Sequence, residues 1–306
     1  MKAEPEFVPA YLALFERGEL RVRDDAAQVH LERCDLCAHY CNINRRQTIR
    51  GAVCRTGEQA VVHSFGPHHG EEVPLRGWRG SGTIFFSWCN LRCVFCQNWE
   101  ISQKGIGRAV SPQELAAMML ELQAEGCHNI NLVSPSHVVA QIIAAIHIAV
   151  EQGLRLPLVY NTGGYDSLEA LTLLDGIIDI YMPDMKYADA TIARRYSKIR
   201  SYVAFNQAAV KEMHRQVGDL VMNDQGIAQR GLLVRHLVLP RQLAGTEQVL
   251  TFLAEEISPD TYLNLMAQYH PCYRAMENPP LDRPLSRTEY ITARQLAQRH
   301  GLTRLD

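Results

Sequence analysis

The chain has 306 residues, of which 47% are hydrophobic and 21% are charged, and its formal net charge at pH 7 is −2. This composition is typical of a globular protein with a sizeable core, and the nearly balanced charge argues against a nucleic-acid or membrane partner. The most apolar segment, residues 138–150, is interrupted by Gln141 and His147 and is too short to span a bilayer. An acidic N-terminus and nine closely grouped cysteines favour a cytoplasmic location over secretion.

Residues 1–75 are expected to form a helix followed by a metal-binding region. Residues 7–18 have the spacing of a short amphipathic helix that ends at a glycine. Four cysteines then follow in the pattern C-x2-C-x3-C-x12-C, namely Cys34, Cys37, Cys41 and Cys54. Hydrophobic burial alone rarely groups cysteines in this way, so the pattern indicates one closed metal site. Structural zinc and an auxiliary iron–sulfur cluster are both compatible with it.

A segment rich in glycine and proline, residues 63–72, contains three histidines and two glutamates. These residues could bind a metal, but they lack the i, i+4 spacing of ligands on a helix. We therefore expect this segment to be a connecting loop that packs near the cysteine loop that follows.

Three further cysteines follow a run of β-branched and aromatic residues at 82–88, which predicts a buried strand. Cys89, Cys93 and Cys96 have the spacing C-x3-C-x2-C, and cysteine thiolates are the usual ligands of iron–sulfur clusters. Three local ligands leave one iron of a four-iron cube open, unless a distant residue closes it. An open iron can bind and activate a small molecule. A structural zinc or redox site is the alternative, although closed zinc sites prefer four ligands.

This motif, with Phe95 before the last cysteine, resembles that of the radical S-adenosylmethionine (SAM) enzymes. The flanking residues 80–86 and 96–102 are similar to PflX-like homologues of pyruvate formate-lyase activating enzyme, and the resemblance extends from about Cys34 to the C-terminus. It implies a [4Fe-4S] cluster whose open iron binds the amino and carboxylate groups of SAM. One electron then splits SAM into methionine and a 5′-deoxyadenosyl radical, which abstracts hydrogen from a substrate. The similar enzymes also carry the four N-terminal cysteines, and they usually have glycine where this chain has Trp88.

Helical and strand patterns alternate after the cysteine loop. Ser111 and Glu114 form a capping box, with proline at the first helical position, that opens a helix ending near Gly126. Further strands are expected at 129–134, 157–162, 179–185, 231–240 and 261–269, and helices near 136–153, 167–175, 189–198, 205–217, 246–257 and 286–300. With the first strand this makes six β/α units and predicts a parallel sheet. The number fits the partial (β/α)6 TIM-like barrel that the resemblance implies. We place this barrel at residues 76–275, with a C-terminal helix in residues 276–306.

Ligands of α/β barrels bind at the C-terminal ends of the strands, so polar residues there are the candidate site. The second strand ends at Ser134, Ser136 and His137, where many radical SAM enzymes have a Gly-Gly-Glu-Pro motif that holds the SAM amino group. These residues or the backbone could supply that contact, or Ser136 could cap the next helix. The third strand ends in three residues that resemble the turn contacting the SAM ribose, and an ordinary turn is the alternative. These residues are Asn161, Thr162 and Gly163.

Three more strand ends carry charged or polar residues. Asp184 and Lys186 share one face and are similar to the Asp-x-Lys of activating enzymes, which implies catalytic roles beside SAM; a structural ion pair is the alternative. The resemblance assigns Arg235 to the SAM carboxylate or ribose, and His270 to the adenosyl group with a catalytic role. Cys272 is expected to be a buried small hydrophobe, with a hydrogen-donor role as the alternative.

Three functions stay open at this point. The first is a radical SAM oxidoreductase that activates a glycyl-radical enzyme by abstracting hydrogen from one of its glycines. The second is the same chemistry on a peptide or small molecule, with the N-terminal metal region as a gate or electron relay. Both require an electron donor such as flavodoxin or ferredoxin. The third is a two-cluster electron-transfer protein in which every iron has a protein ligand.

Overall fold

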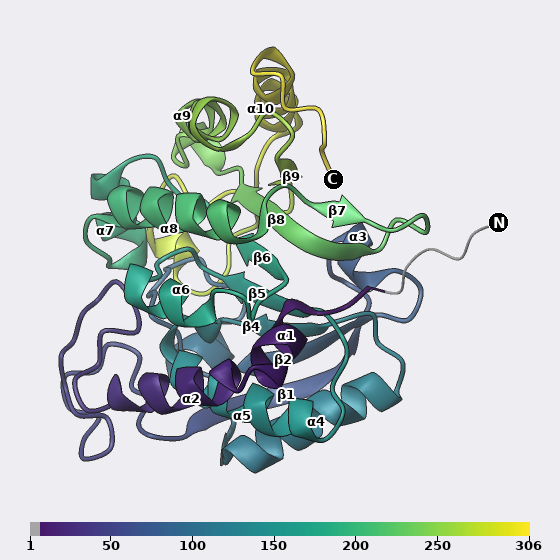
Figure 1. The fold of residues 1–306 in the computed structure, drawn as a ribbon. Helices are drawn as coiled ribbons and strands as arrows, with labels where there is room; N and C mark the ends of the chain where they lie inside the picture. Colours follow the sequence, from purple (N-terminus) through teal and green to yellow (C-terminus); the bar gives the residue numbers. More distant parts are fainter. Residues whose placement is uncertain (1–6) are drawn as a thin grey trace.

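The computed structural model describes residues 7–306 and has an α/β fold built on a mixed sheet (Figure 1). Six of its strands run parallel and neighbour one another in chain order. They are β2 (Ser81–Phe86), β4 (Ile130–Val133), β5 (Leu158–Thr162), β6 (Ile180–Pro183), β8 (Ala228–Leu237) and β9 (Tyr262–Met266). The six strands predicted from the sequence are therefore confirmed, as are their parallel direction and their order. Strand β9 pairs with β8 on one side, and on its other side Leu263 forms a parallel bridge with Leu305 near the C-terminus.

The expectation of a loop at residues 63–72 is wrong for its first part. Residues 60–68 form strand β1 (Ala60–His68), which pairs antiparallel with β2 and places Phe65 opposite Ile84. A short strand, β3 (Arg108–Val110), pairs with the start of β1. Gly66 and Pro67 are uncommon residue types within strands, so the sequence favours a loop here. Proline is tolerated here because β3 reaches only residues 60–62, so the second half of β1 lies at a sheet edge.

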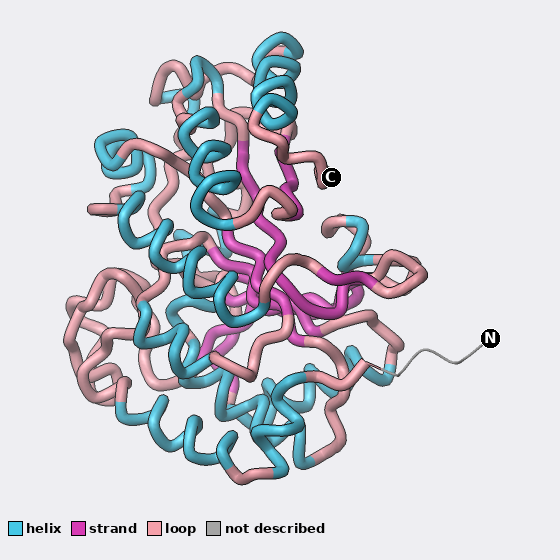
Figure 2. Tube along the Cα trace, turned by 45° about the horizontal axis from the view of Figure 1, so that its top comes forward, coloured by secondary structure: helices cyan, strands magenta, loops and turns pink. Residues whose placement is uncertain are grey.

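Helices surround the strands, which lie at the centre of the molecule (Figure 2). They are α1 (Ala10–Glu16), α2 (Glu19–Val29), α3 (Val73–Arg76), α4 (Pro112–Ala124), α5 (Val139–Glu151), α6 (Leu168–Leu174), α7 (Ala190–Ser197), α8 (Tyr202–Val217), α9 (Thr246–Phe252) and α10 (Arg287–Arg299). A short strand, β7 (Val221–Met222), pairs antiparallel with β8. Helix α2, which packs on α5, was not predicted. The Ser111 capping box is confirmed, since the Ser111 hydroxyl accepts a hydrogen bond from the Glu114 N–H at 3.2 Å.

Side chains on the inner face of the parallel strands change from apolar to polar along each strand. Val159 and Ile180, at the start of β5 and β6, belong to one buried apolar cluster with Leu233 in the middle of β8. Two or four residues further on, on the same face, the chain has Asn161, Asp184 and Arg235. The apolar layer thus supports a polar layer at the C-terminal ends of the strands.

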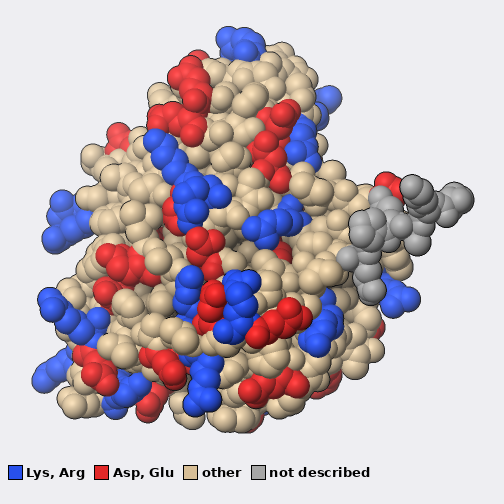
Figure 3. Space-filling view, in the orientation of Figure 1, with Lys and Arg blue, Asp and Glu red and all other residues tan. Residues whose placement is uncertain are grey.

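The surface has no large region of a single charge on the face drawn in Figure 3, where basic and acidic side chains alternate. This agrees with the net charge of −2. Within residues 7–306, no helix has both the length and the apolar character that crossing a membrane would require.

Candidate functional site

The loop after β2 carries Cys89, Cys93 and Cys96, and each sulfur has a polar hydrogen-bond partner. The Leu91 N–H donates to Cys89 Sγ at 3.3 Å, and the hydroxyls of Ser197 and Ser102 lie 3.0 Å from Cys93 Sγ and 3.1 Å from Cys96 Sγ. N–H and O–H donors to sulfur stabilise thiolates and tune the clusters that thiolates hold.

Burial acts against ionisation of these thiols when no cation is near. It raises the pKa of Cys89 to about 12 and that of Cys93 to about 11, and it also raises the pKa of Cys96. Cys93 is buried and the other two cysteines are partly exposed, so three thiolates this close together on one loop need a bound cation to compensate their charge. Iron of a [4Fe-4S] cluster would supply it, so the donor set fits such a group.

An open pocket of about 230 Å³ lies beside this loop, at the C-terminal ends of the parallel strands. It combines two of the cysteines with residues from β6, β8 and β9, as the barrel rule predicts. Its lining is Cys93, Phe95, Cys96, Gln97, Asn98, Asp184, Lys186, Arg235, Leu237, Met266, Gln268, Tyr269 and His270.

Asp184 connects two cations at the floor of this pocket. Its carboxylate bonds to the Lys186 ammonium and accepts from Arg235 Nε at 2.9 Å. Burial raises the pKa of Asp184, but the positive charges of Arg235 and Lys186 outweigh burial and hold this pKa below its ordinary value. Likewise, burial lowers the pKa of Lys186, and the charges of Asp184 and Cys93 more than reverse the effect. All three groups are therefore charged at neutral pH.

Phe95 and His270 occupy different depths of the pocket. Phe95 is 7% exposed and packs edge-on against Tyr269, with ring centroids 5.9 Å apart. His270 is exposed at the rim, where its Nδ1 lies 3.1 Å from the Gln268 carbonyl. The expected burial of Cys272 is wrong, because this thiol is partly exposed just beyond β9.

Ser136 and Thr162 do not line the pocket. Their hydroxyls bond to each other at 2.8 Å, and Thr162 Oγ1 donates to the buried Asp166 at 2.7 Å. Ser136 does not cap α5 either, since Val138 holds the N-cap position without a side-chain bond. Both hydroxyls serve a buried network that includes Tyr160, whose O–H donates to Asp166 at 2.9 Å. The sequence missed Asp166, which follows the predicted turn.

Of the other strand-end residues, Asn161 and Gly163 lie next to residues of the pocket floor. Asn161 Oδ1 accepts from Arg235 Nη2 at 2.7 Å. Gly163 lies between the cysteine loop and the lysine of the floor, since a Cβ there would be 3.1 Å from Leu91 and 3.8 Å from Lys186 Cε. Ser134 is partly exposed and has a left-handed φ of 60° that turns the chain after β4.

Trp88 has a φ of 67°, in the left-handed region that favours glycine. Glycine adopts this conformation without strain, which fits the glycine that the family resemblance implies at this position. The indole packs on Gly105, where an added Cβ would lie 2.1 Å from the ring, and Arg55 lies over the same ring at 5.3 Å. These contacts hold the strained residue in place directly before Cys89.

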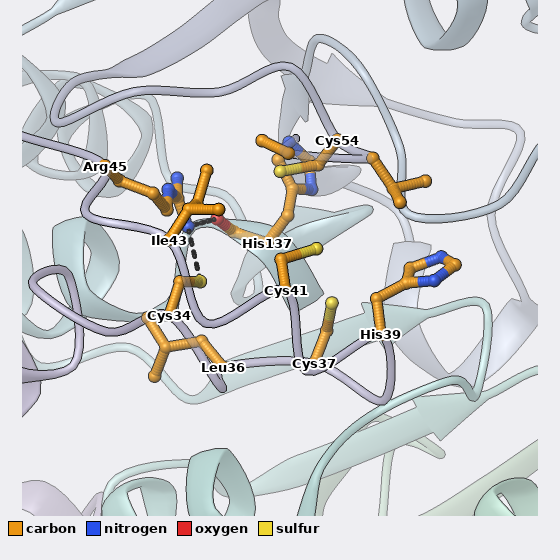
Figure 4. Close-up of a pocket in the computed structure, with 11 residues that line it drawn as sticks. Cys34, Leu36, Cys37, His39, Cys41, Ile43, Arg45, Cys54 and His137 are labelled. Carbon is orange, nitrogen blue, oxygen red and sulfur yellow. Dashed lines mark hydrogen bonds between the residues drawn. The ribbon is translucent and has the colours of Figure 1, made fainter. Parts of the chain in front are cut away.

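The N-terminal cysteines surround a second, smaller pocket (Figure 4). Cys34, Cys37 and Cys54 are buried and Cys41 is partly exposed. Their loop packs against the first cysteine loop, because His39 Nε2 lies 2.6 Å from the Asn90 carbonyl. Among residues 7–306, no group of three or more His, Cys, Asp or Glu side chains has the spacing that a bound metal ion requires. Metal binding at either cysteine group therefore rests on residue chemistry and packing.

Glu72, which the sequence placed in a loop, is the buried N-cap residue of α3, and its side chain contacts β8 and β9. Its Oε1 accepts from Asn264 at 3.0 Å and lies 3.7 Å from Arg235 Nη1. Burial and the neighbouring Glu72 raise the pKa of Glu71 to about 7, against the opposing charge of Arg235. No local pattern marks these glutamates, because their partners lie on β8 and β9.

Comparisons with known proteins agree with this arrangement. Residues 83–218 match the radical SAM superfamily profile. The chain is 31% identical over 293 residues to "Uncharacterized protein MJ0674" of Methanocaldococcus jannaschii, which covers 92% of this chain and 79% of the archaeal protein. It is 24% identical over 288 residues to "Uncharacterized protein MJ0808" of the same organism, covering 88% and 79% of the two chains. The chain therefore carries a radical SAM superfamily match within residues 83–218, the segment that includes the Cys89, Cys93 and Cys96 loop.

Two solved structures show more distant similarity. One is a radical SAM methyltransferase from Sphaerobacter thermophilus, with 13% identity and a TM-score of 0.48 over 73% of this chain and 65% of that one, slightly less than two thirds of its length. The other is TYW1 with a lysine-pyruvate adduct bound, with 13% identity and a TM-score of 0.43 over 71% and 73% of the chains.

Proposed function

We propose that this protein binds a [4Fe-4S] cluster through Cys89, Cys93 and Cys96, cleaves SAM and abstracts hydrogen from a substrate. The radical SAM superfamily match of residues 83–218 supports this chemistry. The observation that carries the proposal is that two of these thiols share one pocket with the charged group formed by Asp184 and Lys186.

Cys89, Cys93 and Cys96 would hold the cluster, which would supply the electron for cleavage of SAM to methionine and a 5′-deoxyadenosyl radical. The chain's own residues hold and orient the reactants. Arg235 and Lys186 present positive charge to a carboxylate, and Asp184 presents negative charge to an ammonium group. Phe95 and Tyr269 form an apolar wall that excludes water from the reacting atoms.

For the substrate, we propose a glycine of a partner glycyl-radical enzyme, on the basis of the Asp184 and Lys186 pattern shared with activating enzymes. The exposed rim around His270 leaves the pocket accessible to a partner chain. A peptide or small molecule is the alternative substrate. A flavodoxin or ferredoxin would supply the electron.

We also propose that Cys34, Cys37, Cys41 and Cys54 bind a second metal centre, either zinc or an auxiliary iron–sulfur cluster. The four cysteines line one pocket and their loop contacts the first cysteine loop, which supports a second centre close to the first. Metal analysis of anaerobic protein, compared with a variant lacking these four cysteines, identifies the metal.

The central test is spectroscopic. Reduced, anaerobically reconstituted protein should show an electron paramagnetic resonance (EPR) signal that changes when SAM is added, and should form 5′-deoxyadenosine. Cys93→Ala should abolish both, whereas Cys127→Ala, a buried core cysteine far from the loop in sequence, should retain both. A signal unaffected by SAM would favour the electron-transfer alternative.

The substrate proposal has its own test. Incubation with a glycyl-radical enzyme should produce the doublet EPR signal of a glycyl radical on that partner. A chain that cleaves SAM but yields no such signal with any partner would favour the peptide or small-molecule alternative.

A further inference from the structure

Arg45 is a buried arginine at the edge of the four-cysteine pocket, with only 2% of its surface exposed. Its guanidinium donates to three backbone carbonyls, those of Thr56 at 2.9 Å, His137 at 2.7 Å and Gly57 at 3.0 Å. The same Nη1 that reaches His137 also points at Cys34 Sγ, 3.7 Å away (Figure 4).

The charge of this guanidinium has no carboxylate partner within 4.0 Å in residues 7–306, as the ion pairs of that region show. The next residue, Arg46, is on the surface and pairs with Glu32 at 3.2 Å and Glu58 at 3.7 Å. A buried charge is unfavourable unless it is compensated, and carbonyls are neutral. Of the groups that Arg45 contacts, only the sulfur of Cys34 can carry a negative charge.

Arg45 also joins this pocket to the proposed SAM site. The carbonyl that it holds belongs to His137, the last residue of the turn after β4. The imidazole of His137 is 2% exposed, and its Nε2 lies 3.0 Å from the Ser87 carbonyl, two residues before Cys89. One guanidinium therefore contacts the four-cysteine loop and, through a single histidine, the start of the other cysteine loop.

We propose that Arg45 is a positioning residue that couples the two cysteine sites. It compensates the thiolate charge of the metal-loaded N-terminal site, and it fixes the turn after β4 and the base of the Cys89 loop through His137. This inference rests on the second metal centre under the proposed function. A consequence of this coupling is that metal binding at the second centre strengthens SAM binding in the neighbouring pocket.

The experiment compares Arg45→Gln, which removes the charge, with Arg45→Lys, which retains it, and with the matched surface control Arg46→Gln. Metal affinity of the second site is measured by chelator competition, with Zn²⁺ alone and with Fe²⁺ plus sulfide, in chains whose Cys89, Cys93 and Cys96 are alanine. SAM affinity is measured by EPR titration in chains that retain those cysteines. Circular dichroism and thermal melting establish that each variant is folded.

We expect Arg45→Gln to weaken metal binding by about 10- to 100-fold, as loss of a hydrogen-bond partner of a metal ligand does. We expect it to weaken SAM binding by about fivefold or more, the lower end of typical coupling between sites. Arg45→Lys should recover most of the metal affinity, and Arg46→Gln should match the wild type.

Two results would overturn the inference while leaving the second metal centre intact. Equal metal affinity in the Gln and Lys variants would show that the charge has no role, and weaker metal binding with unchanged SAM affinity would show that the sites are not coupled. A wild-type chain that binds neither metal at the four cysteines would refute the second centre itself, and the inference with it. SAM cleavage at the first cysteine loop is scored separately by 5′-deoxyadenosine formation.

Discussion

His236 lies on β8 and is fully buried, with its Nδ1 2.6 Å from the Met185 carbonyl and its Nε2 3.0 Å from the Thr246 hydroxyl. Burial lowers the pKa of His236 to about 4, below the value of about 6.5 for an exposed histidine. At a pH between about 4 and about 6.5, His236 therefore takes up a proton more readily in the unfolded chain than in the folded chain. The stability that depends on neutral His236 is fully present above pH 6.5 and is lost as the pH falls toward 4.

The size of this loss follows from the two pKa values. A difference of about 2.5 in pKa corresponds to about 3 kcal/mol once the pH lies well below 4. At pH 5, where the folded chain remains almost entirely unprotonated at this site, the loss is about 2 kcal/mol.

The assay is urea denaturation of the wild type and of His236→Asn at pH 7.5 and pH 5.0, at matched metal content. Asparagine can still donate to the Met185 carbonyl but cannot take up a proton. We expect the free energy of unfolding of the wild type to fall by about 2 kcal/mol more than that of the variant. Other titrating groups, such as Asp179 and His137, are present in both chains and cancel. Parallel pH dependence in the two chains would refute the assignment of this loss to His236.

Two substitutions test the floor of the pocket and the packing of the cysteine loop. Asp184→Asn should destabilise the chain by about 3 kcal/mol and weaken SAM binding, because it leaves the partly buried Arg235 without its closest counter-charge. Unfolding and SAM titrations measure this, and wild-type stability would contradict it. Gly105→Ala should lower the free energy of unfolding by about 3 kcal/mol, because the added Cβ would lie 2.1 Å from the Trp88 ring. The control Gly153→Ala should lower it by only about 1 kcal/mol, because φ is also positive there but no atom lies within 4 Å of the added Cβ. Equal losses in the two alanine variants would show that the Trp88 contact is unimportant.

Local sequence patterns determined most of the secondary structure of this protein. The alternation of apolar strands and amphipathic helices predicted all six parallel strands, and the Ser111 capping box predicted where α4 begins. The spacing of Cys89, Cys93 and Cys96 indicated the class of chemistry. Each of these features depends on residues a few positions apart, so their periodicity or spacing is visible without knowledge of the fold.

Only the tertiary structure decided how these segments use their polar residues. It turned residues 60–68 into a strand, because the edge of β2 was available for pairing. It directed Ser136 and Thr162 into a buried network, and it brought Arg45 to Cys34 and to His137, 92 residues away in the chain. These contacts join residues that are distant in sequence. Packing decides which buried charges and hydrogen-bonding groups come together, and a local sequence pattern does not predict this.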